Sequence, residues 1–194
     1  MHPVPLGFGR FYVQQPHGFT YKDWMRELKA GRCFVTTGPM LMTTVNGHPP
    51  GHVFDNAKPD TPYEIAGTVE GRREIDRVEM IVNGQIVQTL KPQSVRTKAG
   101  AFSTAIRVTI TPAGSCWIAT RVFSKHPVGR VRFAHSSPVH IEIPGRPLRP
   151  RREEVAYIVR HPTSNPSAAA AGRNSSLPSP GSPGRQDARG HTPP

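Results

Sequence analysis

The feature that most constrains the fold is the segment MIVNGQIV, residues 80–87, in which an Asn-Gly pair separates two short runs rich in β-branched residues. An Asn-Gly pair in this setting favours the two-residue type I′ turn of a β-hairpin, because both residues tolerate a positive φ. A second Asn-Gly pair follows a similar run in TTVNGHPPG, residues 43–51. We therefore expect antiparallel strands joined by tight turns.

Short strands separated by frequent turn signals dominate the rest of the chain. Among 194 residues there are 18 Gly and 22 Pro, and only 36% of the residues are hydrophobic. From Phe102 to Ile110 every second side chain falls on one face, which is typical of a strand with one buried face. The predicted strands cover residues 10–14, 33–37, 41–46, 63–69, 77–82, 85–90, 102–110, 116–124, 129–135 and 139–143. This pattern predicts a mainly β fold, an antiparallel β-sandwich.

One or two short helices and a tail complete the predicted structure. Near the start, Thr20 can cap a helix with Asp23 three residues later, and Gly31 suits the residue that ends it. A second short helix is expected over residues 153–160, which begin with two Glu and end with Arg. Residues 163–194 are rich in Pro, Gly and Ser and lack an apolar period, so we expect a disordered tail.

The chain has a large excess of positive charge, with 25 Lys and Arg against 13 Asp and Glu and a formal charge of +12. Such a chain attracts an anionic ligand, whether an acidic glycan, a nucleic acid or a phosphate ester. The segments GRFYV and GRVRFAH interleave arginine with aromatics, but they match the motif of RNA-binding sheets only in part, which disfavours nucleic acid. No stretch approaches the ~18 apolar residues of a membrane span, and the first residues do not have the pattern of a signal peptide.

The segment GRCFVTTGPML, residues 31–41, has a superficial likeness to a functional loop. A phosphate-binding P-loop has four residues between its glycines and then a lysine, whereas Gly31 and Gly38 are seven apart and no lysine follows. Cys33 lies beside apolar residues between two turns, which is typical of a strand rather than of an activated nucleophile. For Cys33 and Cys116 we expect two buried thiols, with a single bridge in an oxidising compartment as the alternative.

The sequence shows no evident catalytic or metal-binding pattern. His48 and His52 are four residues apart, but the Pro-Pro-Gly between them excludes the helix that would project both rings from one face. The few acidic residues form no pair suited to acid–base chemistry across a cleft, and we find no Ser-His-Asp spacing. Taken alone, the sequence therefore shows no catalytic apparatus and leaves open whether the chain is an enzyme.

Several motifs follow one another along residues 7–161 in an order that matches a known family. They are RFYV, FTYKDWMRELKAGRCFVTTGPMLMTTVNGHPPGHVF, the Asn-Gly hairpin, CWIATRVF, GRVRFAHSSPVHIEI and PLRPRREEVAYIV. In this order they resemble the C-terminal portion of the CehA/McbA family of metallohydrolases, which belongs to the polymerase-and-histidinol-phosphatase (PHP) superfamily. The resemblance covers nearly all of the chain ahead of the tail. One departure is Thr37, where the family often has Asn.

The resemblance implies a β-sandwich that follows, and packs on, a metal-dependent hydrolase barrel. In the family the metal ligands precede the Arg-x-Tyr strand, here residues 10–12, so we expect no metal ligand in this chain and a divalent metal only in full-length members. The resemblance also implies that four residues contact substrate at the entrance of an intact enzyme: Arg10, Arg32, Thr36 and His135. For the two arginines, salt bridges across the domain junction are the alternative.

The predicted organisation has four parts: 1–40, the end of a PHP-type barrel; 41–145, the β-sandwich; 146–162, a basic linker and closing helix; and 163–194, the tail. The first hypothesis is the C-terminal segment of a PHP-type hydrolase, without independent activity and prone to self-association through the surface that would meet the barrel. The second is a stand-alone basic module that binds an acidic glycan or nucleic acid. The third is the product of a truncated or mis-started gene without a selected role.

Overall fold

A computed structural model describes residues 6–125 and 131–160 of the chain. The predicted tail, residues 163–194, and the first part of the predicted strand 129–135 lie outside the described residues. Neither of the helices in the described part of the chain is long and apolar enough to span a membrane.

The chain divides into two compact units, Met1–Arg149 and Pro150–Pro194. In the second unit the described structure is the helix α2 (Arg152–Arg160), which confirms the second expected helix. Glu153 and Glu154 lie in its first turn and Arg160 in its last, where each charge interacts favourably with the helix dipole. The strands and the other helix belong to the first unit, which is described from here on.

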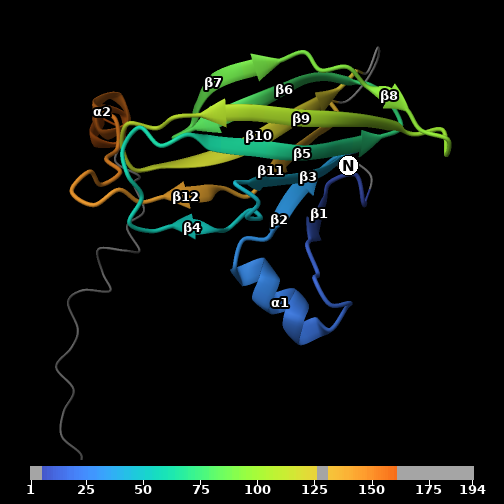
Figure 1. The fold of residues 1–194 in the computed structure, drawn as a ribbon, viewed down its shortest axis with the longest axis horizontal. Helices are drawn as coiled ribbons and strands as arrows, with labels where there is room; N and C mark the ends of the chain where they lie inside the picture. The colour runs from blue at the N-terminus through green and yellow to red at the C-terminus, as the bar shows by residue number, and fades with distance from the viewer. Residues whose placement is uncertain (1–5, 126–130, 161–194) are drawn as a thin grey trace, which may run out of the picture. The chain divides into compact units, whose positions relative to one another are not determined.

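The first unit is a mainly β fold of two sheets that confirms the predicted β-sandwich (Figure 1). The larger sheet has eight strands: β1 (Arg10–Val13), β2 (Cys33–Thr36), β11 (Phe133–Ser136), β10 (Cys116–Ser124), β12 (Val139–Ile141), β4 (Val53–Phe54), β6 (Ile75–Val82) and β7 (Gln85–Leu90). The smaller sheet has four: β3 (Met40–Val45), β5 (Tyr63–Gly71), β9 (Phe102–Ile110) and β8 (Val95–Arg96). All named pairs are antiparallel except β12 with β4, and the two-residue strands β4 and β8 were not expected from the sequence.

The core lies between the two sheets and is built from alternate residues of the long strands. In β9, Thr104, Ile106 and Val108 are buried while the residues between them are exposed, which confirms the alternation seen in the sequence. The aliphatic side chains of the core include Ile65, Val69, Val78, Met80, Ile118, Val122 and Ile141. A small polar pair closes one edge, where the buried Thr104 hydroxyl lies 2.7 Å from Ser94 Oγ.

The two Asn-Gly pairs form tight turns with different consequences for pairing. Asn83 and Gly84 have φ values of 49° and 79°, as a type I′ turn requires, and they join β6 to β7. Asn46 and Gly47 have similar φ values of 46° and 79°, but the chain after this turn makes only a single bridge, from His48 back to β3. The strand β3 pairs along its length with β5 instead.

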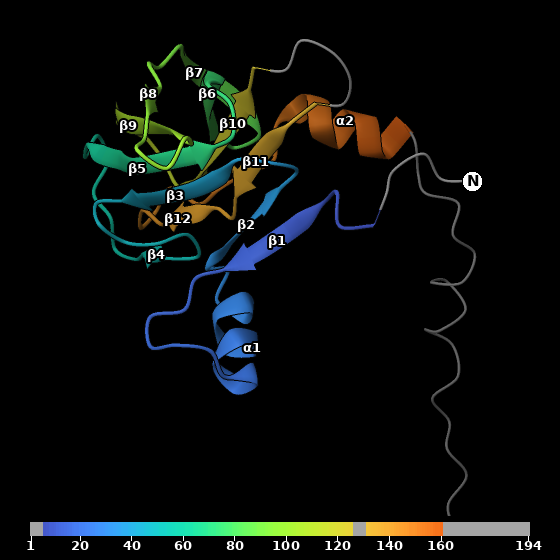
Figure 2. The ribbon, with the colours of Figure 1, turned by 90° about the vertical axis from the view of Figure 1, so that its right-hand side faces the viewer.

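The helix α1 (Tyr21–Lys29) connects β1 to β2, and these three elements, residues 10–36, are called the extension below. Thr20 caps the helix as predicted, because its side chain accepts a hydrogen bond from the Asp23 amide at 3.1 Å. Gly31 ends it with a φ of 73°. Strands β1 and β2 continue the larger sheet through β11, whereas α1 stands clear of the sandwich (Figure 2).

Candidate functional site

The register of the larger sheet separates the four residues predicted to contact substrate. Arg10 pairs with Thr36, so these two side chains share one face of the sheet. His135 pairs with Val35 and therefore belongs to the opposite face. Arg32 precedes β2 and lies beside the helix. The structure thus brings Arg10 and Thr36 to the same face but does not gather all four residues around one site.

Thr36 is buried, and its hydroxyl is occupied within the turn that follows β2. Its Oγ1 donates to the Pro39 carbonyl at 2.6 Å and accepts from the Gly38 amide at 2.9 Å. The neighbouring Thr37 hydroxyl accepts from the Phe133 amide at 2.9 Å. These bonds hold the β2–β3 turn against β11, so the Thr36 hydroxyl stabilises the turn.

Arg32 forms an ion pair within the extension. Its partner, Glu27, is only 4% exposed. Glu27 Oε1 accepts from Arg26 Nε at 3.0 Å, and Oε2 lies 3.0 Å from Arg32 Nη1 in an ion pair without hydrogen-bond geometry. The two arginines compensate a carboxylate that the fold removes from water. The ion pair of Arg32 is thus a structural one, but it lies inside the extension and does not cross the predicted domain junction as the alternative required.

His135 lies on the outer face of the larger sheet, where its cross-strand neighbour on β10 is Arg121. Its Nδ1 is 2.7 Å from the Ser136 carbonyl oxygen, and because a carbonyl can only accept, Nδ1 carries the proton. This bond fixes the ring and leaves Nε2 as the nitrogen that can contact another group.

Arg10 lines an open groove of about 1400 Å³ at one end of the sandwich. We call it the basic groove, because its lining includes six basic side chains: Arg10, Arg72, Arg73, Arg77, Lys125 and Arg132. Two acidic side chains, Glu74 and Asp76, also line it. The β2–β3 turn with Gly38 and Pro39 forms part of its wall, and Gly38 packs directly beside the Arg132 side chain.

Part of this positive charge is neutralised by ion pairs. Arg77 contacts Asp76 at 3.1 Å and Glu79 at 2.8 Å, and Lys125 contacts Glu74 at 2.5 Å. Burial alone would raise the pKa of Glu79, but hydrogen bonds from Arg77 and Arg121 outweigh it and hold this pKa below its ordinary value. Glu79 is therefore ionised in the fold.

The remaining charge in the basic groove is uncompensated. Among the described residues, Arg10, Arg72 and Arg73 take part in no ion pair, and all three are exposed. Arg132 donates one hydrogen bond to the Thr37 carbonyl at 2.8 Å and places its guanidinium 4.4 Å from the Phe8 ring. Neither contact neutralises its charge. The geometry thus offers four guanidinium groups to an anion.

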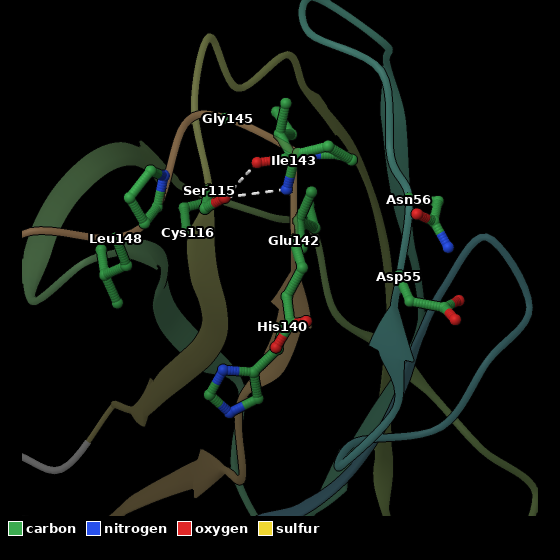
Figure 3. A pocket seen from close by; sticks show the side chains of 12 residues that line it. Asp55, Asn56, Ser115, Cys116, His140, Glu142, Ile143, Gly145 and Leu148 are labelled. Carbon is green, nitrogen blue, oxygen red and sulfur yellow. Dashed lines mark hydrogen bonds between the residues drawn. The ribbon is translucent and has the colours of Figure 1, made fainter.

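A second pocket, of about 770 Å³, holds residue types that could suggest a nucleophile site (Figure 3). Cys116 pairs with Ile141 and His140 with Trp117, so the thiol and the imidazole belong to opposite faces of the sheet. Burial raises the pKa of the Cys116 thiol to about 11, which keeps it protonated at neutral pH. Figure 3 also shows the Asp55 carboxylate directed away from the His140 ring. This pocket lacks the arrangement that nucleophilic catalysis needs.

Both cysteines are free, Cys116 buried and Cys33 half-buried. Cys33 Sγ lies 3.0 Å from Oγ of Ser137, which is in the turn between β11 and β12. Of the two thiols expected to be buried, Cys116 is buried but Cys33 is only half-buried, and the alternative bridge between them is not present.

The sequence did not predict that His48 and His52 lie together. Their rings stack with centroids 3.9 Å apart, and the Phe54 ring meets both edge-on. The Pro-Pro-Gly turn, with Gly51 at a φ of 81°, folds the chain back and produces this contact. Parallel stacked rings direct their nitrogen lone pairs side by side rather than toward one point. No group of three metal-ligating side chains is found in residues 6–125 and 131–160.

Comparisons of the chain with protein-family models, curated proteins and solved structures find no match. The family resemblance therefore rests on the motifs of the sequence alone, and the geometry of the extension and of the basic groove must support any function on its own.

Proposed function

We propose that this chain is a β-sandwich segment that packs on a metal-dependent hydrolase barrel of the PHP type, and that its own residues do not carry the catalysis. The observation that supports this most is the exposure of large apolar side chains on the extension. Five of them are at least one-third exposed: Phe11, Phe19, Tyr21, Met25 and Val35. A soluble domain rarely leaves such a group uncovered unless another surface meets it.

The exposed apolar side chains of the extension lie on its two strands, on its helix and just before the helix. Phe11 and Val35 are cross-strand neighbours on β1 and β2, and they share the outer face of the sheet. The Phe11 ring lies 5.6 Å from the ring of Trp24 on α1, which joins the strand face to the helix. Tyr21 and Met25, one helical turn apart, continue the surface along the same side of α1. The result is one apolar surface across both strands and the helix.

The extension is preorganised to meet a partner. Tyr12 and Phe34 stack across the two strands with ring centroids 5.4 Å apart, and the Glu27–Arg32 ion pair fixes the helix against β2. A surface that is rigid before binding loses little conformational entropy on binding, so more of the burial energy becomes affinity. This favours an interface over a mobile arm.

The order of the sequence motifs supports the identity of the partner. In the family that the chain resembles, the segment equivalent to the extension joins the barrel to the sandwich. A divalent metal would belong to the barrel, where His, Asp and Glu side chains hold it, and would activate water for hydrolysis. The residues of this chain would contribute the packing surface.

The proposal can be tested with a photoreactive amino acid placed at Tyr21 in cells that naturally produce the protein, with Val87 on β7 as the matched exposed control. We expect crosslinks at Tyr21 to residues of a polypeptide, or of a longer form of this one, that binds a divalent metal. Crosslinks at Tyr21 only to polypeptides that bind no such metal would overturn the proposal.

The statement about catalysis has a separate test. The purified chain would be analysed for bound metal and for hydrolysis of phosphate, ester and amide substrates. We expect no turnover. Stoichiometric zinc, manganese or iron, together with turnover that a chelator abolishes, would contradict the proposal.

A further inference from the structure

The basic groove is not needed for the packing role, because it lies away from the apolar face of the extension. Arg10 in the groove and Phe11 on the packing surface are consecutive residues of β1, so their side chains point to opposite faces of the sheet. The groove is built from segments that are distant in sequence: the starts of β1, β6 and β9, the β2–β3 and β5–β6 turns, the end of β10 and the two residues before β11. A second function can therefore reside there.

The charge of the groove selects anions. Its six basic and two acidic lining residues give a formal excess of four positive charges. Guanidinium groups present paired N–H donors that match the oxygens of carboxylate, sulfate or phosphate. Because Arg10, Arg72 and Arg73 are exposed and take part in no ion pair within the described residues, an anion would displace water rather than an existing partner.

The aromatic side chains of the groove argue against single-stranded nucleic acid. Binding of that class relies on open ring faces on which bases stack. The guanidinium of Arg77 covers the Phe123 ring at 3.8 Å, so one face of that ring is already occupied. Phe102 is the one other aromatic among the described lining residues, and a single half-buried ring does not provide a row of platforms.

The two carboxylates of the groove point to a ligand that carries hydroxyl groups as well as anionic groups. Each has one oxygen in an ion pair, Glu74 with Lys125 and Asp76 with Arg77, and no other residue within 6–125 and 131–160 donates a hydrogen bond to the second oxygen. These oxygens can accept hydrogen bonds from hydroxyls, whereas they would repel a continuous row of phosphates. Sugars that alternate hydroxyls with sulfate or carboxylate groups fit both requirements.

We propose that the basic groove binds a segment of an acidic glycan, with Arg10, Arg72, Arg73 and Arg132 paired to its sulfate or carboxylate groups and Glu74 and Asp76 accepting hydrogen bonds from its hydroxyls. The open shape of the groove suits a chain that passes through it rather than a small enclosed ligand.

The test uses the full chain and a heparin-derived hexasaccharide, with binding measured by calorimetry at several salt concentrations. We expect submicromolar affinity at low salt. If four ion pairs form and each releases about one counterion, affinity should fall roughly 250-fold between about 50 and 200 mM salt. Absence of binding at low salt would overturn the proposal.

Two variants with the same change in net charge locate the site. Arg72→Ala with Arg73→Ala should weaken binding by at least about tenfold and lower the salt slope by about two, because two exposed partners are lost. Lys58→Ala with Arg149→Ala removes two exposed charges outside the groove and should leave affinity within about twofold. Equal losses in both variants would show attraction by net charge alone and would overturn the proposal.

Two further measurements keep the test decisive if a variant folds poorly. Nuclear magnetic resonance titration of the unaltered chain should shift signals of Gly38, Arg72 and Arg73, and shifts confined to other regions would contradict the proposal. A single-stranded oligonucleotide of equal charge should bind more weakly than the hexasaccharide. Tighter binding of the oligonucleotide would overturn the choice of a glycan.

Discussion

The sandwich and the extension use the same residue types in opposite ways. Tyr63 on β5 is 4% exposed and packs edge-on against Phe54 at 5.0 Å, whereas Tyr21 on α1 is 71% exposed. The sandwich places its large apolar side chains between two sheets, where each faces a partner layer. The extension has one layer, a two-stranded edge with a helix beside it, and five of its large apolar side chains are at least one-third exposed. The difference supports the proposal that the extension is one side of an interface.

The largest expected effect is a difference in the free energy of unfolding between truncating a core side chain of the sandwich and truncating an exposed side chain of the extension. Ile65→Ala on β5 removes a fully buried side chain and should lower the free energy of unfolding by about 3–4 kcal/mol. Met25→Ala on α1 removes a side chain that is already one-third exposed and should cost less than about 1 kcal/mol in the isolated chain. Chemical denaturation of both variants measures the difference. Similar losses would show that the helix surface is as well packed as the sandwich.

The second prediction concerns the close approach of the end of α1 to Gly51, in the segment between β3 and β4. A Cβ at Gly51 would lie 1.7 Å from the Ala30 carbonyl oxygen, and Gly51 has a φ of 81°. Gly51→Ala should therefore cost about 2–3 kcal/mol and speed hydrogen exchange of the α1 amides more than that of β9. Gly47→Ala is the control, because Gly47 has a similar φ but a Cβ added there would have no atom within 4 Å. Equal exchange profiles for both variants would contradict this.

These first two effects also show how far the sequence could predict the structure. The alternation in β9 and the Asn83–Gly84 turn identified the sandwich, because period-two burial and turn chemistry are local properties of the chain. The Thr20 cap and the end of α1 at Gly31 followed from local signals for the same reason. Gly51 gave no such signal, since its close approach to Ala30 depends on tertiary packing.

The candidate site was less predictable. Arg10 was singled out from the sequence, and it does line the basic groove. Arg72 and Arg73, in the β5–β6 turn, were missed because the charge of an exposed turn is informative only once the fold places it beside Arg132. Sequence spacing also could not reveal that Arg32 would face Glu27, or that His135 would lie on the opposite face from Arg10.

A smaller effect on stability is expected at Glu79, which forms ion pairs with Arg77 on β6 and Arg121 on β10. Glu79→Gln leaves the Arg77 and Arg121 guanidiniums without their shared carboxylate and should destabilise the sandwich by about 1–2 kcal/mol. Glu64→Gln, which breaks the exposed pair with Arg107, should change stability by less than about 0.5 kcal/mol. Thermal unfolding measures both, and equal shifts would show that burial of Glu79 adds nothing.

The smallest effect is a dependence on pH at the stacked histidines. Burial, the neighbouring His48 and the Arg32 charge lower the pKa of His52, against a weaker opposing effect of Asp55. The unfolded chain therefore binds more protons than the folded one below about pH 6.5, so stability should fall as the pH drops from that value toward the lower pKa of the folded state. His52→Gln should weaken this dependence. An unchanged profile of stability against pH would exclude the stack as its origin.

The most direct measurement is sedimentation velocity of the purified chain at tens of micromolar, because an uncovered interface should self-associate. We expect reversible association of the unaltered chain that Phe19→Ser with Tyr21→Ser abolishes. Ile86→Ser with Val87→Ser on β7 should leave the association unchanged, although these two side chains are also about half exposed. A monodisperse monomer, or association that depends on β7 instead of α1, would contradict the assignment of the extension as an interface.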